Sequence, residues 1–188
     1  MSVKIIAGKL KGMNIDVPNS ARATLGRARK SLFDTLESLK LSNVDVGEFF
    51  KNKIVIDCFA GSGAIGLETL SRGAKYAYFI DIDRSAIQQI KANISKLKMT
   101  EFSTVICSDI RKLKNNSEHI CDFAFFDPPF HVNMDLPKIV THLIDNQWIG
   151  QNTIVVIETP KNIINLENFK IIATKKVGTI TFSIYTMI

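Results

Sequence analysis

The sequence predicts one α/β domain, built on a mostly parallel seven-stranded sheet and preceded by a small β-hairpin and helix. Two observations carry this prediction. From residue 53 onward, short apolar runs alternate with longer segments of helical spacing, which is the pattern of βαβ units in a parallel sheet. After Pro160 the pattern changes to two runs joined around Val177 and Gly178, which is typical of an antiparallel pair.

The strands and helices follow from this alternation. The first strands are continuous apolar runs, as expected when helices cover both faces of a sheet. Parallel strands are expected at residues 54–59, 76–81, 104–108, 123–127 and 153–159. Helices are expected near residues 64–72, 84–98 and 135–147, and the closing antiparallel pair at residues 170–176 and 179–187.

An N-terminal extension precedes the sheet. Residues 3–17 alternate like a β-hairpin, and residues 26–39 carry apolar side chains at the spacing of an amphipathic helix. The polar stretch 42–47 then indicates a boundary. We therefore expect the extension to cover residues 1–42 and the main domain to cover residues 43–188.

The positive charge is concentrated in that extension. The formal charge of the chain is +6, and residues 1–40 hold eight lysines and arginines against three acidic residues. A basic module at one end of a chain suggests a polyanionic partner. Charge alone fits equally well a solvated face that keeps the protein soluble.

Composition argues against several classes of protein. No apolar run approaches the ~18 residues of a membrane span, and the first residues lack the pattern of a signal peptide. We therefore expect a soluble cytoplasmic protein without membrane contact.

Cys58, Cys107 and Cys121 form no disulfide framework, and the histidines have no metal-ligand spacing, so we expect no metal ion.

A glycine-rich loop follows the first parallel strand. Gly61, Gly63 and Gly66 have the spacing of the GxGxxG fingerprint, between an expected strand and an expected helix. Asp81 ends the next strand, twenty positions after Gly61, where an acid that binds ribose hydroxyls belongs. The glycine spacing alone is a weak signal, but the strand, the helix and the acid all agree with a nucleoside site.

Charge decides which nucleoside this loop would bind. Asp57 ends the strand directly ahead of the loop, where it would repel the pyrophosphate of a dinucleotide. S-adenosylmethionine carries an ammonium and a sulfonium and no phosphate, so Asp57 would attract its cationic end. We therefore predict S-adenosylmethionine as the cofactor and a Rossmann-like class I fold of S-adenosylmethionine-dependent methyltransferases, with Asp81 accepting hydrogen bonds from both ribose hydroxyls.

The predicted cofactor residues lie at the carboxyl ends of the first three strands, where ligands of open α/β sheets bind. Asp109 ends the third strand and is placed to accept from the adenine amino group; alternatively, it caps the helical segment that follows. The full predicted set is Asp57, Phe59, Ala60, Gly61, Ser62, Gly63, Asp81, Ile82, Asp109 and Ile110.

A second motif, Asp127-Pro128-Pro129-Phe130, ends the fourth strand at the same edge. The two prolines fix the backbone and leave the nearby carbonyls free to accept hydrogen bonds. An amine conjugated to a ring is a poor nucleophile, and hydrogen bonds to the Asp127 carboxylate and the Pro128 carbonyl would aim its lone pair at a methyl group. Phe130 would stack on the base. In isolation the motif also fits a structural turn, but the neighbouring glycine loop favours a catalytic site.

With these motifs in place, the sequence resembles, over nearly its whole length, the bacterial guanine-N2 methyltransferases that modify 16S ribosomal RNA. The resemblance rests on the glycine loop, the DPPF motif and the N-terminal segments 5–12 and 22–33. The N-terminal segments are its specific part, because many amino methyltransferases share the other two motifs. The sequence departs from the family at Ala23, where proline is usual, and at Lys30, where glutamate is frequent.

The resemblance implies methyl transfer to the N2 amine of a guanine in 16S ribosomal RNA, with the small subunit as substrate and a monomeric enzyme. It also implies RNA contacts from the basic extension, and the residues expected to make them are Lys9, Lys11, Arg22, Thr24, Arg27 and Arg29.

One alternative is a methyltransferase acting on adenine N6 or cytosine N4 of DNA or another RNA; the missing target-recognition domain argues against DNA. The other is a non-catalytic RNA-binding assembly factor, against which the intact Asp57, glycine loop and Asp127 argue.

Overall fold

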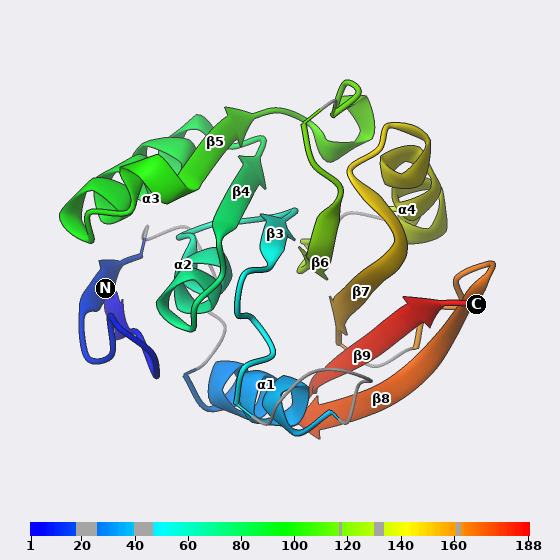
Figure 1. The fold of residues 1–188 in the computed structure, drawn as a ribbon, viewed down its shortest axis with the longest axis horizontal. Helices are drawn as coiled ribbons and strands as arrows, with labels where there is room; N and C mark the ends of the chain where they lie inside the picture. Colours follow the sequence, from blue (N-terminus) through cyan, green and yellow to red (C-terminus); the bar gives the residue numbers. More distant parts are fainter. Residues whose placement is uncertain (18–25, 40–46, 117, 130–133, 161–162) are drawn as a thin grey trace.

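The computed structural model describes residues 1–17, 26–39, 47–116, 118–129, 134–160 and 163–188. Within these residues, seven strands form one sheet in the order β5-β4-β3-β6-β7-β9-β8 (Figure 1). Neighbours from β5 to β7 pair in parallel, whereas β9 lies antiparallel between β7 and β8. The strands are β3 (Ile54–Asp57), β4 (Tyr76–Asp81), β5 (Ser103–Cys107), β6 (Cys121–Phe126), β7 (Ile149–Thr159), β8 (Phe169–Val177) and β9 (Ile180–Met187). The predicted Rossmann-like architecture with a closing antiparallel pair is confirmed.

Helices cover both faces of this sheet. One face carries α1 (Gly26–Ser38), α2 (Ala64–Ser71) and α3 (Arg84–Lys96), and the other carries α4 (Leu136–Asp145) and the short 3-10 helix η2 (Ile110–Lys112). Alternation along β3 divides the core, because Val55 packs on the first side and Ile56 on the second. Both residues are fully buried, which explains the continuous apolar runs in the sequence. None of the described helices combines the length and the apolarity of a membrane span.

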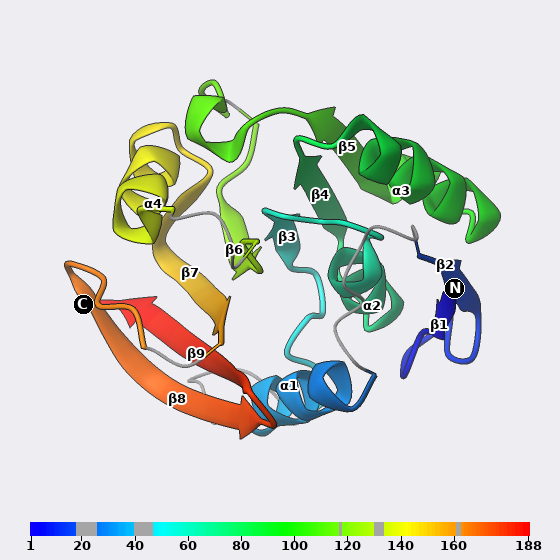
Figure 2. The same ribbon diagram turned by 180° about the vertical axis from the view of Figure 1, so that it is seen from behind.

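The N-terminal extension has the predicted hairpin and helix. Strands β1 (Ser2–Lys4) and β2 (Asn14–Asp16) pair antiparallel, and α1 follows them in the chain. The hairpin lies beside α2 and α3 (Figure 2), and Ile15 of β2 is buried in the same apolar cluster as Leu67 of α2. The extension and the sheet therefore share one core. The predicted boundary at residue 42 lies outside the described residues.

Two local features differ from the prediction. Strand β7 begins at Ile149 instead of residue 153, because Cys121 pairs with Ile149 before the register shifts. The polar residues of this first part of β7 do not resemble a strand in the sequence. The 3-10 helix η1 (Thr100–Phe102) was not expected, since three residues are too few to show helical periodicity, whereas η2 is the helical segment after Asp109 that the sequence left open.

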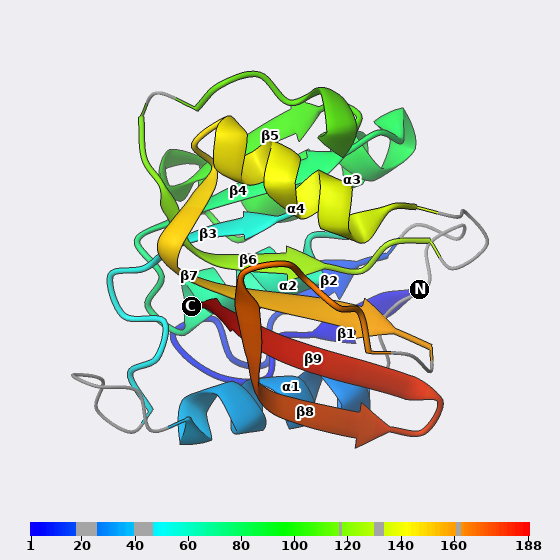
Figure 3. The same ribbon diagram turned by 90° about the vertical axis from the view of Figure 1, so that its right-hand side faces the viewer.

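The parallel strands all point towards one edge of the sheet, which we call the carboxyl edge (Figure 3). Strand β3 ends there at Asp57 and β4 ends at Asp81, and Asp127 follows the last residue of β6. This arrangement places the predicted cofactor and catalytic motifs at the same edge.

Candidate active site

Asp57 ends β3 and is buried, with 1% of its surface exposed. Its Oδ2 accepts a hydrogen bond from the Gly66 N–H, at 3.1 Å, in the first turn of α2. Burial raises the pKa of this carboxyl group to about 7; Asp127 and Asp81 act in the same direction, and the Gly66 N–H opposes them. A cation bound beside Asp57 would lower that pKa again, so this position suits a positively charged ligand.

The glycine motif that follows β3 needs glycine for two different reasons, one at the start of α2 and one within that helix. Gly63, at the N-cap of α2, has a φ of 79°, in the left-handed region that side chains disfavour. Gly66 lies close to the sheet, where a Cβ would stand 2.3 Å from the ring of Phe79. The glycine at 66 therefore lets α2 pack directly on β4.

Asp81, at the end of β4, holds the glycine loop in place. Its Oδ2 accepts from the Gly61 N–H at 2.8 Å, and its Oδ1 accepts from the Asp83 N–H at 2.9 Å. A carboxylate oxygen has further lone pairs, so Asp81 also has the capacity to accept from ribose hydroxyls. Ile82 beside it is 66% exposed, which leaves its side chain available to a ligand at this edge.

The remaining loop residues of the predicted set lie between Asp57 and Gly63. Phe59 is half-buried, with its ring centroid 6.5 Å from that of Phe126. The Ala60 N–H donates to the Ile80 carbonyl at 2.9 Å, which joins the loop to β4. Ser62 is buried.

Asp109 has the alternative role that the sequence left open. It caps η2 by accepting from the Arg111 N–H at 3.0 Å, and it pairs with the Arg111 guanidinium at 2.6 Å. Hydrogen bonds from the Arg111 side chain hold the pKa of Asp109 below its usual value. An adenine amino group would therefore share this carboxylate with Arg111. Ile110 is buried on the α4 side of the sheet, so it would contact a nucleoside through its backbone.

Strand pairing brings Asp127 beside the glycine loop. Asp57 pairs with Phe125 between β3 and β6, and the Cys58 N–H donates to the Phe125 carbonyl at 2.9 Å. Asp127 follows two residues later, and its charge contributes to the raised pKa of Asp57. The Asp57 carboxylate, predicted to bind the cofactor, and the Asp127 carboxylate, predicted to bind the amine substrate, therefore lie close enough to influence each other's charge.

Pro128 is buried and Pro129 is half-buried, whereas Phe130 lies outside the described residues, so its stacking role stays a prediction. Chemically, the described part of the motif is a carboxylate followed by a rigid backbone, beside a loop that suits a cationic ligand. Such an arrangement offers hydrogen-bond acceptors to an amino group.

In the described part of the chain, no cluster of three or more His, Cys, Asp or Glu side chains is arranged to hold a metal ion.

The structure contradicts the predicted phosphate contact of Arg29. Its side chain is 1% exposed, its Nη2 donates to the Lys4 carbonyl, and burial lowers its pKa. The physical reason is the phase of α1, because Arg29 shares the buried face of this helix with Leu32 and Phe33. Arg29 therefore fastens α1 to the hairpin.

The other predicted RNA contacts are distributed over two places. Arg27 is exposed in the first turn of α1, whereas Arg22 and Thr24 lie outside the described residues. Lys9 and Lys11 are exposed at the far end of α2, because the Lys9 N–H donates to the carbonyl of Ser71, the last residue of that helix. The Lys9 ammonium lies 5.1 Å from the ring centroid of Phe102. These two lysines are therefore remote from the glycine loop.

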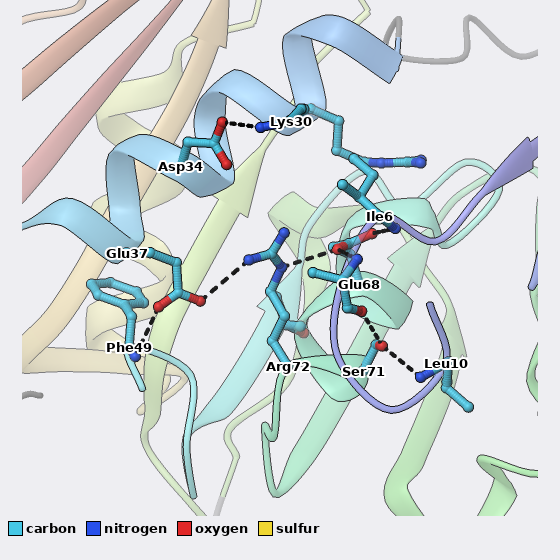
Figure 4. Close-up of polar contacts among 12 residues, drawn as sticks. Ile6, Leu10, Lys30, Asp34, Glu37, Phe49, Glu68, Ser71 and Arg72 are labelled. Atoms are coloured by element: carbon cyan, nitrogen blue, oxygen red, sulfur yellow. Dashed lines mark hydrogen bonds and ion pairs between the residues drawn. The ribbon is translucent and has the colours of Figure 1, made fainter. Parts of the chain in front are cut away.

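The sequence prediction missed a buried polar cluster that holds the extension (Figure 4). Glu68 of α2 is fully buried and accepts from the N–H groups of Ile6 and Ala7, at 2.8 and 3.0 Å. Arg72, one turn later, donates to Glu68 at 3.0 Å and lies 3.4 Å from Glu37 of α1. The cluster thus joins both parts of the extension to the helix that begins at the glycine loop. Its signal in the sequence is a glutamate within the apolar run of α2, which indicates a buried partner.

Comparison with known proteins identifies the family of this chain. A family profile described as conserved hypothetical protein 95 matches residues 3–186. The ribosomal RNA small subunit methyltransferase D of Haemophilus influenzae is 31% identical, over 97% of this chain and 93% of that protein. The protein of the same name from Escherichia coli K12 is 32% identical, over 84% of this chain and 74% of that protein. The structure of a putative methyltransferase from Escherichia coli is 28% identical and covers 100% of this chain and 98% of that one, with a TM-score of 0.82.

Proposed function

The chain belongs to the conserved hypothetical protein 95 family, and from this premise we propose that it methylates the exocyclic N2 amine of a guanine in 16S ribosomal RNA. It is an S-adenosylmethionine-dependent methyltransferase of ribosomal RNA. The guanine N2 position and the small ribosomal subunit as the form of the substrate are the finer part of the proposal. They are supported by the names of the relatives, which refer to the small subunit, and by the acceptor groups at the carboxyl edge.

The residues at this edge fit S-adenosylmethionine. Asp57 is buried with a raised pKa, which a neighbouring ammonium or sulfonium would relieve. Asp81 already accepts from the loop backbone and has lone pairs left for ribose hydroxyls. When bound, S-adenosylmethionine supplies an electrophilic methyl group on a positively charged sulfur. The protein's task is then to hold the amine in line with that methyl group.

The observation that carries the proposal is the parallel pairing of Asp57 with Phe125 between β3 and β6, which brings Asp127, two residues later, to the same edge as the glycine loop. It supports a substrate amine beside the cofactor. The Asp127 carboxylate and the Pro128 carbonyl accept the two amine protons, which draws the nitrogen towards tetrahedral geometry and aims its lone pair. Asp127 also takes up the proton that the methylated amine loses, and Phe130 provides a face for the base to stack on.

RNA binding is assigned to the start of α1 and the segment before it. Arg27 is exposed there, and Arg22 and Thr24 precede it in the chain. Their charge and hydrogen-bond donors suit phosphate oxygens. Lys9 and Lys11 form a second contact point, remote from the glycine loop.

Labelled methyl transfer from S-adenosylmethionine tests the proposed function. The full-length protein is incubated with small ribosomal subunits, naked 16S RNA and DNA, and the acceptors are then digested to nucleosides. The proposal predicts N2-methylguanosine from small subunits. Methylated adenine or cytosine would favour the other amino methyltransferases, and RNA binding without any transfer would favour a non-catalytic assembly factor.

A further inference from the structure

Asn93 lies in α3 with 0% of its surface exposed, and its carboxamide contacts two segments that are distant in sequence. Its Oδ1 accepts from the Asp16 N–H at 3.0 Å, and its Nδ2 donates to the Asp16 carbonyl at 2.8 Å. The same Nδ2 donates to the Ser62 carbonyl at 3.0 Å. Asp16 ends β2 of the hairpin, and Ser62 lies within the glycine loop. One side chain therefore bridges the N-terminal hairpin and the loop.

These contacts use both donors of a buried amide. A carboxamide has two N–H groups, and Asn93 directs one to the hairpin and one to the loop. Together with Oδ1, it pairs with both backbone groups of Asp16, as a neighbouring strand would. A buried carbonyl that loses its donor is costly, so the Asn93 carboxamide contributes to the position of both the hairpin and the loop.

Other attachments of the hairpin lie away from the loop. Ser71, at the end of α2, accepts from the Leu10 N–H at 2.9 Å and donates to the Ala7 carbonyl. Lys96 pairs with the Asp16 carboxylate at 2.9 Å on the exposed surface. Asn93 differs from these residues because its third hydrogen bond reaches the glycine loop itself.

We propose that Asn93 is a positioning residue for the cofactor loop, and that it couples the N-terminal hairpin to the S-adenosylmethionine site. The inference rests on the proposed function, because it takes the glycine loop as the cofactor site. Because coupling between two sites is reciprocal, cofactor binding then stabilises the hairpin position by the same free energy by which that position favours cofactor binding.

The test compares full-length Asn93→Ala with Ser71→Ala, which removes two hairpin hydrogen bonds at the other end of α2. Calorimetry gives the dissociation constant of S-adenosylhomocysteine, and methyl transfer to small ribosomal subunits gives kcat and the KM for S-adenosylmethionine. Asn93→Ala should raise the dissociation constant and KM about tenfold while kcat at saturating cofactor stays within about twofold. Ser71→Ala should leave all these values within about twofold of the unaltered protein. Equal effects of the two variants, or an unchanged Asn93→Ala, would overturn the proposal.

A second measurement uses the unaltered protein, so it tests the coupling between the hairpin and the cofactor loop even if Asn93→Ala does not fold. Hydrogen exchange of the Asp16 N–H, which Asn93 holds, should slow at least about threefold when S-adenosylhomocysteine binds, as expected for linked local opening. Exchange of the Leu10 N–H, which Ser71 holds, should not change. Equal exchange of Asp16 with and without the ligand would refute the coupling. If the unaltered protein binds no S-adenosylhomocysteine, the cofactor assignment fails first, and the coupling fails with it.

Discussion

The Asp81 carboxylate accepts a hydrogen bond from the Gly61 N–H at 2.8 Å, so one residue joins the end of β4 to the glycine loop. Asp81 is also the proposed acceptor for ribose hydroxyls. Asp81→Ala removes both functions and should weaken S-adenosylhomocysteine binding by about 1.5 to 3 kcal/mol, the range for hydrogen bonds to a charged group. Asp81→Asn keeps an oxygen acceptor and should lose less. Calorimetry on both variants checks this, and an Asp81→Ala protein with full affinity would contradict it.

Asp57 should make the stability of the ligand-free protein depend on pH. Burial raises its pKa from 3.8 to about 7, so between these values the folded chain holds a proton that the unfolded chain has lost. This contribution is complete below about pH 4 and is lost as the pH rises through 7, with a size on the order of 4 kcal/mol. Asp83, Asp109 and Asp135 have lowered pKa values, so they change the free energy of unfolding only at pH values below this window.

Urea unfolding between pH 4.5 and 8 measures that effect. Asp57→Asn is the matched control, because its side chain has the same size and cannot ionise. The unaltered protein should lose stability relative to Asp57→Asn as the pH rises. Parallel profiles for the two proteins would show that Asp57 does not carry the raised pKa.

Arg27, exposed in the first turn of α1, should contribute one phosphate contact to RNA binding. Arg27→Ala is expected to weaken binding to small subunits and to reduce the slope of log affinity against log salt by about 0.7 to 0.9. Lys138→Ala removes the same charge from α4, on the opposite face of the sheet, and should keep the slope. An unchanged slope in Arg27→Ala would remove this residue from the RNA interface.

Arg29 should behave differently from its neighbour, because its guanidinium is buried against the Lys4 carbonyl. Arg29→Ala is expected to lower the free energy of unfolding by about 1 to 3 kcal/mol, through lost packing and a lost hydrogen bond. Its salt slope for RNA should match that of the unaltered protein. Urea titration and RNA binding at several salt concentrations test both statements; a flattened slope with unchanged stability would reverse the assignment.

The sequence predicted the order and type of the main elements because alternation between apolar runs and helical spacing is a direct consequence of burial on both faces of a parallel sheet. It missed the beginning of β7, where polar residues pair through an irregular register. Pairing of that kind depends on the neighbouring strand, which a local pattern does not contain.

The positions of candidate site residues were predictable where the backbone requires them. Gly66 is required by the ring of Phe79, and Asp57 and Asp81 are placed by the ends of their strands. Arg29 was assigned by its charge, although the apolar spacing of α1 already places it on the buried face. Asn93 was not identified, because a polar residue in a helix indicates a buried partner at most and does not say which distant segments it joins.

We propose that this chain methylates guanine N2 and that Asp127 accepts a hydrogen bond from the target amine. The measurement that tests it most directly is mass spectrometry of nucleosides from small subunits treated with S-adenosylmethionine and either the unaltered protein or Asp127→Ala. We expect N2-methylguanosine with the unaltered protein, a rate at least about a hundredfold lower with Asp127→Ala, and equal S-adenosylhomocysteine affinity for both. A methyl group on another atom, or near-normal turnover by Asp127→Ala, would contradict it.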